Sequence, residues 1–479
     1  MALSAVSTIA ATEGNMSALV TTVRVKWAAS LLLPLLVYSL VDADIHPKLP
    51  LFFAITTWAV TVWALELLPT LPSSAAMTFL FVLCGVATPQ VVFAPWGSFL
   101  PWLCLAALVL GDALEETGLT RRMALRLMLL VGASFRRAVI ALMLTGVFMA
   151  FILPDIMCRV IIFVAIAHGL ALALDLPPRS RISSALIMAG FCAATSPGYG
   201  FLTGTEMALI AMSVAEPLIG PVSWGEYALA NLPFITLYCA FSVFMCTYVI
   251  PRGEHVPEED HLEEVVRQRL QEMGPMTVQE WKLFILMVVA ITGLLTQKWH
   301  GMPGTYVYAF MGMLCYLPWM GLARAENARH LNVGFIVFVV ACLSMGAVAV
   351  HLGAAKWIAS LLVPFMEQLS PTWSVFTAYL SSLTINFVLT PLAAVSSMSA
   401  PMVEIAQALN INPRPMLYAF LYGLDQYIFP YEYILYMYIF STGYATARHM
   451  FLALGLRMVF VGVGILLVQV PYWSFLGLM

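Results

Sequence analysis

Residues Ala193–Glu206 read AATSPGYGFLTGTE, an apolar stretch in which three glycines and a proline fall within eight positions. A second stretch, Tyr422–Glu432, reads YGLDQYIFPYE and mixes the same kinds of residue. Glycine and proline both interrupt helices, so each stretch predicts a helix that breaks and then resumes. Backbone groups released at a break are not tolerated in lipid. Broken helices therefore persist only where they line a protected cavity.

Each interrupted stretch follows the same kind of run, so the chain describes one design twice. Val147–Asp155 leads into a small-residue segment that ends at Leu176, and Leu383–Pro391 leads into one that ends at Ile411. The two copies lie about 235 residues apart. Paired interruptions at corresponding places in two halves are typical of secondary transporters, which bind substrate at the breaks. The pattern therefore predicts a carrier.

The composition makes the lipid bilayer the main solvent of this chain. Of 479 residues, 62% are hydrophobic and 10% are charged, and the mean hydropathy is +0.92. About a quarter of the residues of a soluble chain are charged. The eight cysteines lie in apolar segments without metal-type spacing, and we interpret them as packing residues. With a net charge of −3 and no basic stripe, no nucleic-acid partner is expected.

Apolar segments of spanning length predict an all-α polytopic membrane protein. Uninterrupted spans are expected at 27–43, 50–68, 74–90, 98–115, 226–250, 281–299, 303–320, 332–350 and 450–477. Interrupted spans are expected at 183–215 and 415–441, and re-entrant helical hairpins at 134–176 and 371–411. The sequence thus predicts two repeats, with about 11 transmembrane helices and 2 hairpins in all.

The positive charges of the loops orient this layout. With the N-terminus cytoplasmic, the inner segments hold sixteen lysines and arginines and the outer segments hold four. This asymmetry agrees with the positive-inside rule. It places the first hairpin on the inner side and the second on the outer side, so the repeats are inverted, as alternating access around a central site requires. We expect a multi-pass protein of the cell (inner/plasma) membrane with a cytoplasmic N-terminal segment at 1–26.

Four segments of the chain resemble one family of membrane carriers. Trp63–Pro69 resembles the family's Trp-x-Thr-Glu-Ala-x-Pro, and Glu115–Leu125 carries Glu-x-x-Gly-Leu-x-x-Arg-x-Ala-Leu. Trp224–Pro233 resembles the start of the sixth helix, and Gly443–Leu456 resembles the last helix. In this order and spacing, the chain from about residue 50 is similar to the divalent anion/sodium symporter family, carriers of di- and tricarboxylates and sulfate.

The resemblance implies a homodimer and an elevator mechanism, in which hairpins and broken helices shift against a scaffold. Scaffold helices would lie at 27–115 in repeat 1 and at 281–365 in repeat 2. The transport domain would combine the arm, hairpin and broken helix of 116–250 with the hairpin, broken helix and last helix of 371–479. A cytoplasmic linker at 251–280 would join the repeats.

The chain departs from this family where the family binds substrate and sodium. Members carry Ser-Asn-Thr at each hairpin tip, whereas the tips here read Leu153–Asp155 and Leu389–Pro391. The family's Gly-Thr-Pro-Pro-Asn loops are replaced at Gly204–Ala208 and Pro430–Tyr433. The resemblance therefore implies the fold and the transporter class, but not sodium coupling or carboxylate chemistry.

Asp155 and Arg159 are the sharpest candidates for chemistry. Ionisable groups at membrane depth cost about 2.5–3.5 kcal/mol each on insertion scales and mark function by default. The two residues lie four apart, so they share one face if the second arm of the hairpin is helical. Either Arg159 faces an anionic substrate and Asp155 binds a cation or proton, or the two form an ion pair that keeps the tip folded.

Glu206 and Glu432 occupy corresponding places in the two interrupted helices. With unwound carbonyls they supply oxygen ligands for Na+, with candidate positions near Gly198, Gly204 and Gly423, or they bind and release H+. We favour H+ coupling or exchange, because the sodium motifs are altered. The alternative is that each glutamate caps the N-terminus of a half-helix, where a negative charge is favourable.

Polar side chains cluster at the breaks and hairpin tips, where they would orient an anion. The predicted substrate-binding residues are Pro154, Asp155, Arg159, Thr195, Ser196, Thr203, Thr205, Thr390, Pro391, Ser396, Asp425 and Tyr431. The predicted coupling-ion residues are Asp155, Glu206 and Glu432. Individually, a serine or threonine in a transmembrane helix more often bonds its own backbone, so only the clustering favours a role in binding.

The prediction is a secondary active transporter of a small dianion, a di- or tricarboxylate or similar, that is coupled to H+ or Na+ or works by exchange and has no cofactor. The alternative is a cation/proton antiporter of the same superfamily shape that uses its buried carboxylates. An enzyme is not expected, because no His/Cys/Asp cluster has metal spacing and no glycine-rich phosphate loop occurs.

Overall fold

The described part of the chain is helical, with no β-strand. A computed structural model describes residues 24–41, 46–65, 67–98, 100–132, 134–254, 259–296, 304–323, 331, 333–386, 389–428 and 434–479. Six helical segments within these ranges are long and apolar enough to cross a bilayer. The chain divides into two compact units, Met1–Trp96 with Val333–Ile358 and Gly97–Asn332 with Ala359–Met479. The prediction of an all-α, multi-pass protein is confirmed.

The smaller unit combines the first helices of repeat 1 with one helix of repeat 2. Its helices are α2 (Leu49–Ala64), α3 (Thr70–Leu83), α4 (Pro89–Phe93) and α16 (Val333–Leu352), and residues 24–40 are also helical. α16 packs against α2, α3 and α4. Trp63 of α2 joins them, because its indole nitrogen donates to Ser73 Oγ at 3.0 Å and its ring meets Phe338 edge to face.

The larger unit begins with the remaining helices of the first repeat. These are α5 (Leu100–Thr117), α6 (Leu119–Val131), α7 (Phe135–Ile152), α8 (Ile156–Ala173), α9 (Arg181–Thr195), α10 (Glu206–Ile219) and α11 (Trp224–Phe244). Gly118 precedes α6 at φ +68°, a left-handed conformation that glycine adopts without strain. Side chains of Ser134, Asp155 and Ser180 cap the N-termini of α7, α8 and α9.

The second part of the larger unit begins with a polar surface helix, α12 (Glu259–Glu272). The helices after it are α13 (Val278–Leu295), α15 (Gly304–Leu314), α18 (Pro371–Asn386), α19 (Pro391–Ala408), α20 (Pro413–Leu424), α21 (Ile434–Ser441), α22 (Ala447–Gly464) and α23 (Val470–Phe475). α17 (Ala354–Met366) connects α16 to this part of the chain. The predicted hairpins are therefore α7/α8 and α18/α19, and the predicted broken helices are α9/α10 and α20/α21.

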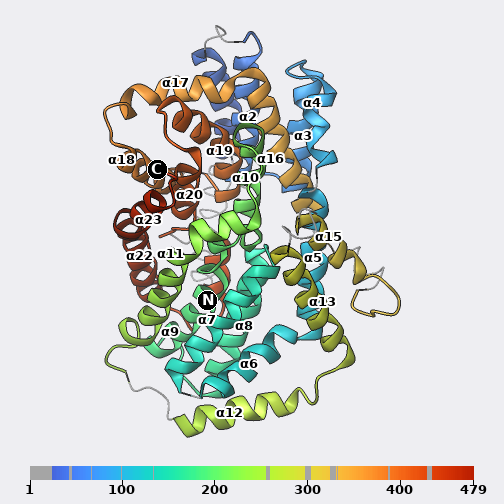
Figure 1. Cartoon of the computed structure of the whole chain (residues 1–479), viewed down its shortest axis with the longest axis vertical. Helices are drawn as coiled ribbons and strands as arrows, with labels where there is room; N and C mark the ends of the chain where they lie inside the picture. Colours follow the sequence, from blue (N-terminus) through green and yellow to red (C-terminus); the bar gives the residue numbers. More distant parts are fainter. Residues whose placement is uncertain are drawn as a thin grey trace, which may run out of the picture. The chain divides into compact units, whose positions relative to one another are not determined.

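The two hairpins and the two broken helices pack in a reciprocal pattern. α7 and α8 pack on α9, and α18 and α19 pack on α20. Beyond the breaks the partners exchange: α10 packs against α19, and α21 packs against α8. α7, α8 and α9 consequently lie toward one end of the unit and α18, α19 and α20 toward the other (Figure 1). Hairpins that approach from opposite ends are the arrangement that the predicted inverted repeats require.

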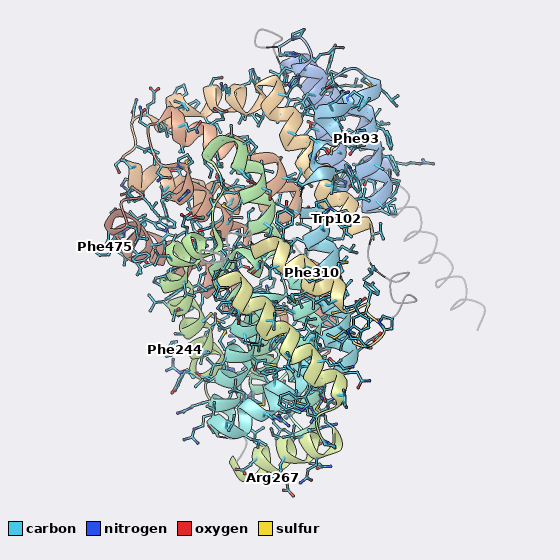
Figure 2. All side chains as sticks on the ribbon, turned by 45° about the vertical axis from the view of Figure 1, so that its right-hand side comes forward. Phe93, Trp102, Phe244, Arg267, Phe310 and Phe475 are labelled. Carbon is cyan, nitrogen blue, oxygen red and sulfur yellow. The ribbon has the colours of Figure 1, made fainter. Side chains whose placement is uncertain are left out.

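The outer surface of the larger unit is apolar along its length. Phe244, Phe310 and Phe475 are 50%, 60% and 85% exposed, and the first and last lie at the margin of the unit (Figure 2). Arg267, by contrast, lies on α12 at one end. Exposed aromatic side chains of this size are costly in water and favourable in lipid, so the flanks of the unit are suited to the hydrocarbon core and α12 to the aqueous boundary.

A buried ion pair fixes the arm helix α6 to the start of α13. Arg122 Nε donates to Glu280 Oε1 at 2.5 Å, and its other nitrogens donate to the carbonyls of Met273, Gly274 and Pro275. Glu280 also accepts from Thr277 N at 2.6 Å in the capping box of α13. Burial by itself raises the pKa of the Glu280 carboxyl, but the hydrogen bonds from Arg122 and Thr277 lower this pKa below its ordinary value.

Glu280→Gln is expected to lower the free energy of unfolding by about 2 kcal/mol at neutral pH, because Arg122 loses its charged partner. Since the pKa of Glu280 is lower in the folded state, its contribution is present above about pH 4.3 and is lost as the pH falls through the folded-state pKa. Thermal unfolding from pH 7 to pH 3 measures this contribution. The variant should lose less stability than the natural chain on acidification, and parallel curves would contradict the assignment.

Candidate functional site

The first break is a closed loop between α9 and α10. After Thr195 the chain makes two 3-10 turns, Gly198–Gly200 and Leu202–Gly204, and α10 begins at Glu206. Gly204 lies so close to Gly198 that a Cβ atom on Gly204 would overlap the carbonyl of Gly198. Glycine is therefore required here for a close approach of backbone to backbone, which fixes the shape of the loop.

Gly204→Ala is expected to destabilise the protein by about 3 kcal/mol, because backbone atoms on both sides cannot move apart within a packed core. Gly225→Ala is the matched control, since a Cβ on Gly225 of α11 meets nothing within 4 Å. It should leave stability unchanged or slightly raised. Thermal unfolding in detergent compares the two, and equal melting temperatures would refute the role of the loop.

Arg159 of α8 is fully buried beside this loop. Its Nη2 donates to Gly204 O at 2.6 Å, while Nε and Nη1 have no hydrogen-bond partner among the described residues. Its predicted ion pair with Asp155 does not form. Asp155 is instead the N-cap of α8, with an extended backbone, and its carboxylate accepts from Cys158 N at 3.0 Å. The N-cap lies outside the helix proper, so the spacing of four does not place the two side chains on one face.

Glu206 attaches the start of α10 to the tip of the first hairpin. Its carboxylate accepts from Ile156 N at 3.4 Å, and its own N–H donates to Pro154 O at 3.2 Å. Thr205, not Glu206, caps α10, because its hydroxyl accepts from Met207 N at 2.9 Å. Glu206 was expected, as one alternative, to cap its own half-helix α10. It instead accepts a hydrogen bond at the N-terminus of the neighbouring helix α8.

The hydroxyls predicted at the first break are all buried and bonded within the protein. Ser196 Oγ lies 3.0 Å from Ser242 Oγ, and Thr203 donates to Phe151 O at 2.9 Å and accepts from the Trp224 indole at 3.0 Å. Thr195 donates to Phe191 O at 3.1 Å. In this conformation these groups hold the loop in place.

The second break begins at Asp425, which closes the C-terminus of α20. Arg457 of α22 is fully buried, and its Nη2 lies 3.2 Å from Asp425 Oδ2 and 3.2 Å from Thr195 Oγ1. Tyr238 of α11 accepts from Arg457 Nε at 2.7 Å and donates to Asp425 at 3.2 Å. The network therefore connects the second break to the end of α9, where the first break starts.

The tip of the second hairpin is anchored by an amide. Asn386 Nδ2, at the end of α18, donates to the carbonyls of Gly423 and Gln426, both at 3.1 Å. Ser396 donates to Leu392 O of its own helix at 2.8 Å, and Pro391 is the first residue of α19. Thr390 is the N-cap of α19 but makes no capping bond through its side chain. Tyr431 and Glu432 lie outside the described residues.

The structure adds two residues to the site that the sequence analysis did not select, Arg457 and Tyr238. Arg457 was detectable in principle, because a single arginine in an apolar helix is costly and marks function by default. Tyr238 carries no such signal, since it is one of many tyrosines in apolar segments. The space between Tyr238, Asp425 and Gln426 is about 10 Å³, room for about one water molecule.

The backbone carbonyl oxygens that were candidate ligands for sodium at the breaks already accept hydrogen bonds from other groups of the protein. Gly204 O accepts from Arg159, and Gly423 O accepts from Asn386 and from Gln426 N. Gly198 O accepts from Phe201 N at 3.3 Å. Within the described ranges, no group of three or more His, Cys, Asp or Glu residues is placed to hold a metal ion.

Inverted hairpins, paired helix breaks and buried arginines that meet at those breaks define a membrane-embedded secondary transporter. Residues 24–479 match the family model for the sodium:sulfate symporter transmembrane region. The chain belongs to this family, the divalent anion/sodium symporters. The resemblance inferred from the sequence motifs is therefore confirmed.

Curated relatives and a solved structure agree with this assignment. The chain is 24% identical over 404 residues to a sodium-dependent dicarboxylate transporter, SdcS, of Staphylococcus saprophyticus, covering 75% of this chain and 73% of that protein. It is also 24% identical to SdcS of Staphylococcus aureus strain USA300, over 64% of each chain. The crystal structure of the Alcanivorax borkumensis YdaH transporter, described as having an unusual topology, has a TM-score of 0.57 at 14% identity, covering 90% of this chain and 98% of that one. This last likeness is one of fold.

Proposed function

We propose that this transporter carries a small dianion, a dicarboxylate or a similar divalent anion, and that the two buried arginines at the breaks bind it. One observation carries the proposal. Arg457 donates a hydrogen bond to Thr195, where the first break starts, and Arg159 donates one to Gly204 O, where the break ends. Two of the Arg159 nitrogens have no hydrogen-bond partner in the part of the chain that the structure describes. A guanidinium buried in this way is stabilised by an anion that accepts its free donors.

The dicarboxylate class is supported by the SdcS relatives, which are named as sodium-dependent dicarboxylate transporters. Two carboxylates on one substrate would match two guanidinium groups that reach the same loop. The remaining predicted substrate residues, namely Pro154, Asp155, Ser196, Thr203, Thr205, Thr390, Pro391, Ser396 and Tyr431, would shape this site after the hairpins move. The void beside Asp425 holds about one water molecule, so a dianion enters only when the breaks or the hairpin tips separate.

An elevator mechanism in a homodimer remains part of the proposal. The hairpins and broken helices pack on one another across the repeats, which favours their movement as one block. The predicted scaffold at 27–115 and 281–365 and the predicted transport domain at 116–250 and 371–479 describe which segments would shift. Such a movement would expose the substrate site to the two sides of the membrane in turn.

For the coupling ion, two observations favour different answers. The relatives are named sodium-dependent, which favours Na+. The guanidinium of Arg159 already bonds Gly204 O, one of the carbonyls where Na+ was expected, which favours H+ coupling or exchange at the first break. The antiporter alternative is less well supported, because the Asp155 and Glu206 carboxylates both cap α8 and are engaged at the hairpin tip.

Uptake by proteoliposomes tests the proposed function. Labelled succinate should accumulate, unlabelled dicarboxylates and sulfate should compete, and monocarboxylates should not. Replacing Na+ by choline should leave most of the uptake, whereas changing the external pH or preloading the vesicles with dicarboxylate should alter it. Strict dependence on Na+ would overturn H+ coupling and exchange. Cation flux without any anion flux would overturn the anion proposal itself.

A further inference from the structure

A cleft of about 360 Å³ lies away from the breaks, between α5, α6, α8 and α12. This volume falls within the range of small-molecule sites in proteins. Its walls are mainly apolar: Ile161, Ile162, Ile166 and Leu170 come from α8, and Leu125 comes from α6. In Figure 1, α12 lies beside α6 and α8 at one end of the unit, and both contacts are present. The cleft is therefore at the aqueous boundary of the apolar helices.

Three charged side chains also line this cleft. Arg121 starts α6 and is exposed, Arg269 belongs to the last turns of α12, and Glu115 ends α5. Arg269 pairs with Glu272 at 3.4 Å, but neither Arg121 nor Glu115 makes an ion pair with the described residues. Two guanidinium groups and one carboxylate beside an apolar wall fit a ligand with a phosphate, an ammonium group and a hydrocarbon chain.

We propose that this cleft binds an aminophospholipid. The phosphate lies against Arg121 and Arg269, the primary ammonium lies against Glu115, and an acyl chain lies along the isoleucines of α8. Guanidinium groups bind phosphate through directed, charge-assisted hydrogen bonds. A lipid without an amine would leave Glu115 facing a phosphate, and a trimethylated amine cannot donate a hydrogen bond to it. The carboxylate therefore selects the primary amine.

The lipid site has a consequence for transport that is separate from substrate binding. α8 is the second helix of the first hairpin, whereas α5 and the arm helix α6 precede that hairpin in the chain. A lipid that contacts Glu115 of α5 together with α6 and α8 would join the predicted scaffold to the predicted transport domain. A bound ligand stabilises the conformation that it binds, so the lipid shifts the carrier toward the conformation of this structure.

Gly169 of α8 lines the cleft and gives the sharpest test. A Cβ on Gly169 would meet nothing within 4 Å, so a leucine there has open space at its Cβ and would occupy part of the cleft. Leucine also favours the helix by about 1 kcal/mol relative to glycine. Native mass spectrometry of protein exposed to an equal mixture of phosphatidylethanolamine, phosphatidylcholine and phosphatidylglycerol should show preferential retention of the first. Gly169→Leu should lose that retention while its melting temperature in pure detergent is unchanged or higher.

Charge variants test the proposed contacts of the phosphate and of the ammonium group separately. Arg121→Gln with Arg269→Gln should lower retention of phosphatidylethanolamine at least about tenfold, the loss of about 1.4 kcal/mol. Glu115→Gln should remove the preference over phosphatidylglycerol without lowering retention of phosphatidylglycerol. Arg267→Gln is the matched control, because Arg267 lies on the same helix but pairs with Glu263 outside the cleft. Equal retention of all three lipids, undiminished retention by Gly169→Leu, or equal stabilisation by chain-free glycerophosphoethanolamine would overturn the proposal.

Discussion

Arg159→Met is expected to abolish dicarboxylate uptake while the protein remains folded. If the free donors of Arg159 bind one carboxylate of the substrate, their loss costs about 3 kcal/mol, or about 100-fold in apparent affinity. The effect on stability should be small, within about 1 kcal/mol. The variant loses one hydrogen bond to Gly204 O, but it also removes a buried charge that forms no ion pair with a described carboxylate, and methionine fills similar space.

Two further variants make this test specific. Arg159→Lys keeps the charge but not the planar array of donors, so it should retain little uptake. Arg126→Met removes an exposed arginine of α6 and should transport normally. Uptake is measured in proteoliposomes containing equal amounts of each protein, with melting temperatures recorded in parallel. Near-normal uptake by Arg159→Met would assign Arg159 a structural role at the loop, whereas a large loss of stability would mean that the loop cannot form without it.

Arg457→Met is expected to lower the free energy of unfolding by about 3–5 kcal/mol, because it leaves the Asp425 carboxylate buried without its cation. Tyr238 and Gln426 still donate to Asp425, but neutral donors do not compensate a charge removed from water. The double variant Arg457→Met with Asp425→Leu removes both charges. It should recover most of the lost stability, since a buried pair can be replaced by apolar side chains at little cost.

A double-mutant cycle on thermal or denaturant unfolding measures this coupling. If the two single effects simply add, the ion pair does not determine the stability of the second break. Uptake by the double variant is a second measurement that tests whether Arg457 contacts the substrate. Restored folding without restored uptake would agree with the proposal that Arg457 contacts the anion, and restored uptake would contradict that part of it.

The breaks and the hairpins could be predicted from the sequence because their causes are local. Glycine and proline disfavour the helix interior through their own backbone, so the close spacing of Pro197, Gly198 and Gly204 located the first break without any tertiary information. The hairpin tip at Leu153–Asp155 was predicted for the same reason, since Pro154 ends one helix and Asp155 caps the next. The order and spacing of the four family-like motifs then led to the family.

The partners of the buried charges could not be predicted, because they depend on atoms far apart in the chain. Of the two alternatives for Asp155 and Arg159, the ion pair is absent: the N-terminal backbone of α8 satisfies the carboxylate, and Arg159 reaches Gly204, 45 residues away. Arg457 and Asp425 are 32 residues apart, and Tyr238 is 187 residues from Asp425. Such contacts leave no spacing that a single sequence reveals.

The sequence by itself determined that this protein lies in a membrane, repeats one helical design twice and breaks a helix in each copy. These properties follow from hydropathy and from the backbone preferences of glycine and proline, which act over a few residues. Only the tertiary structure decided which charges are satisfied by backbone, which are paired and which keep free donors at the breaks. A buried charge takes whichever partner the packing brings within about 3 Å, and the packing is a property of the whole chain.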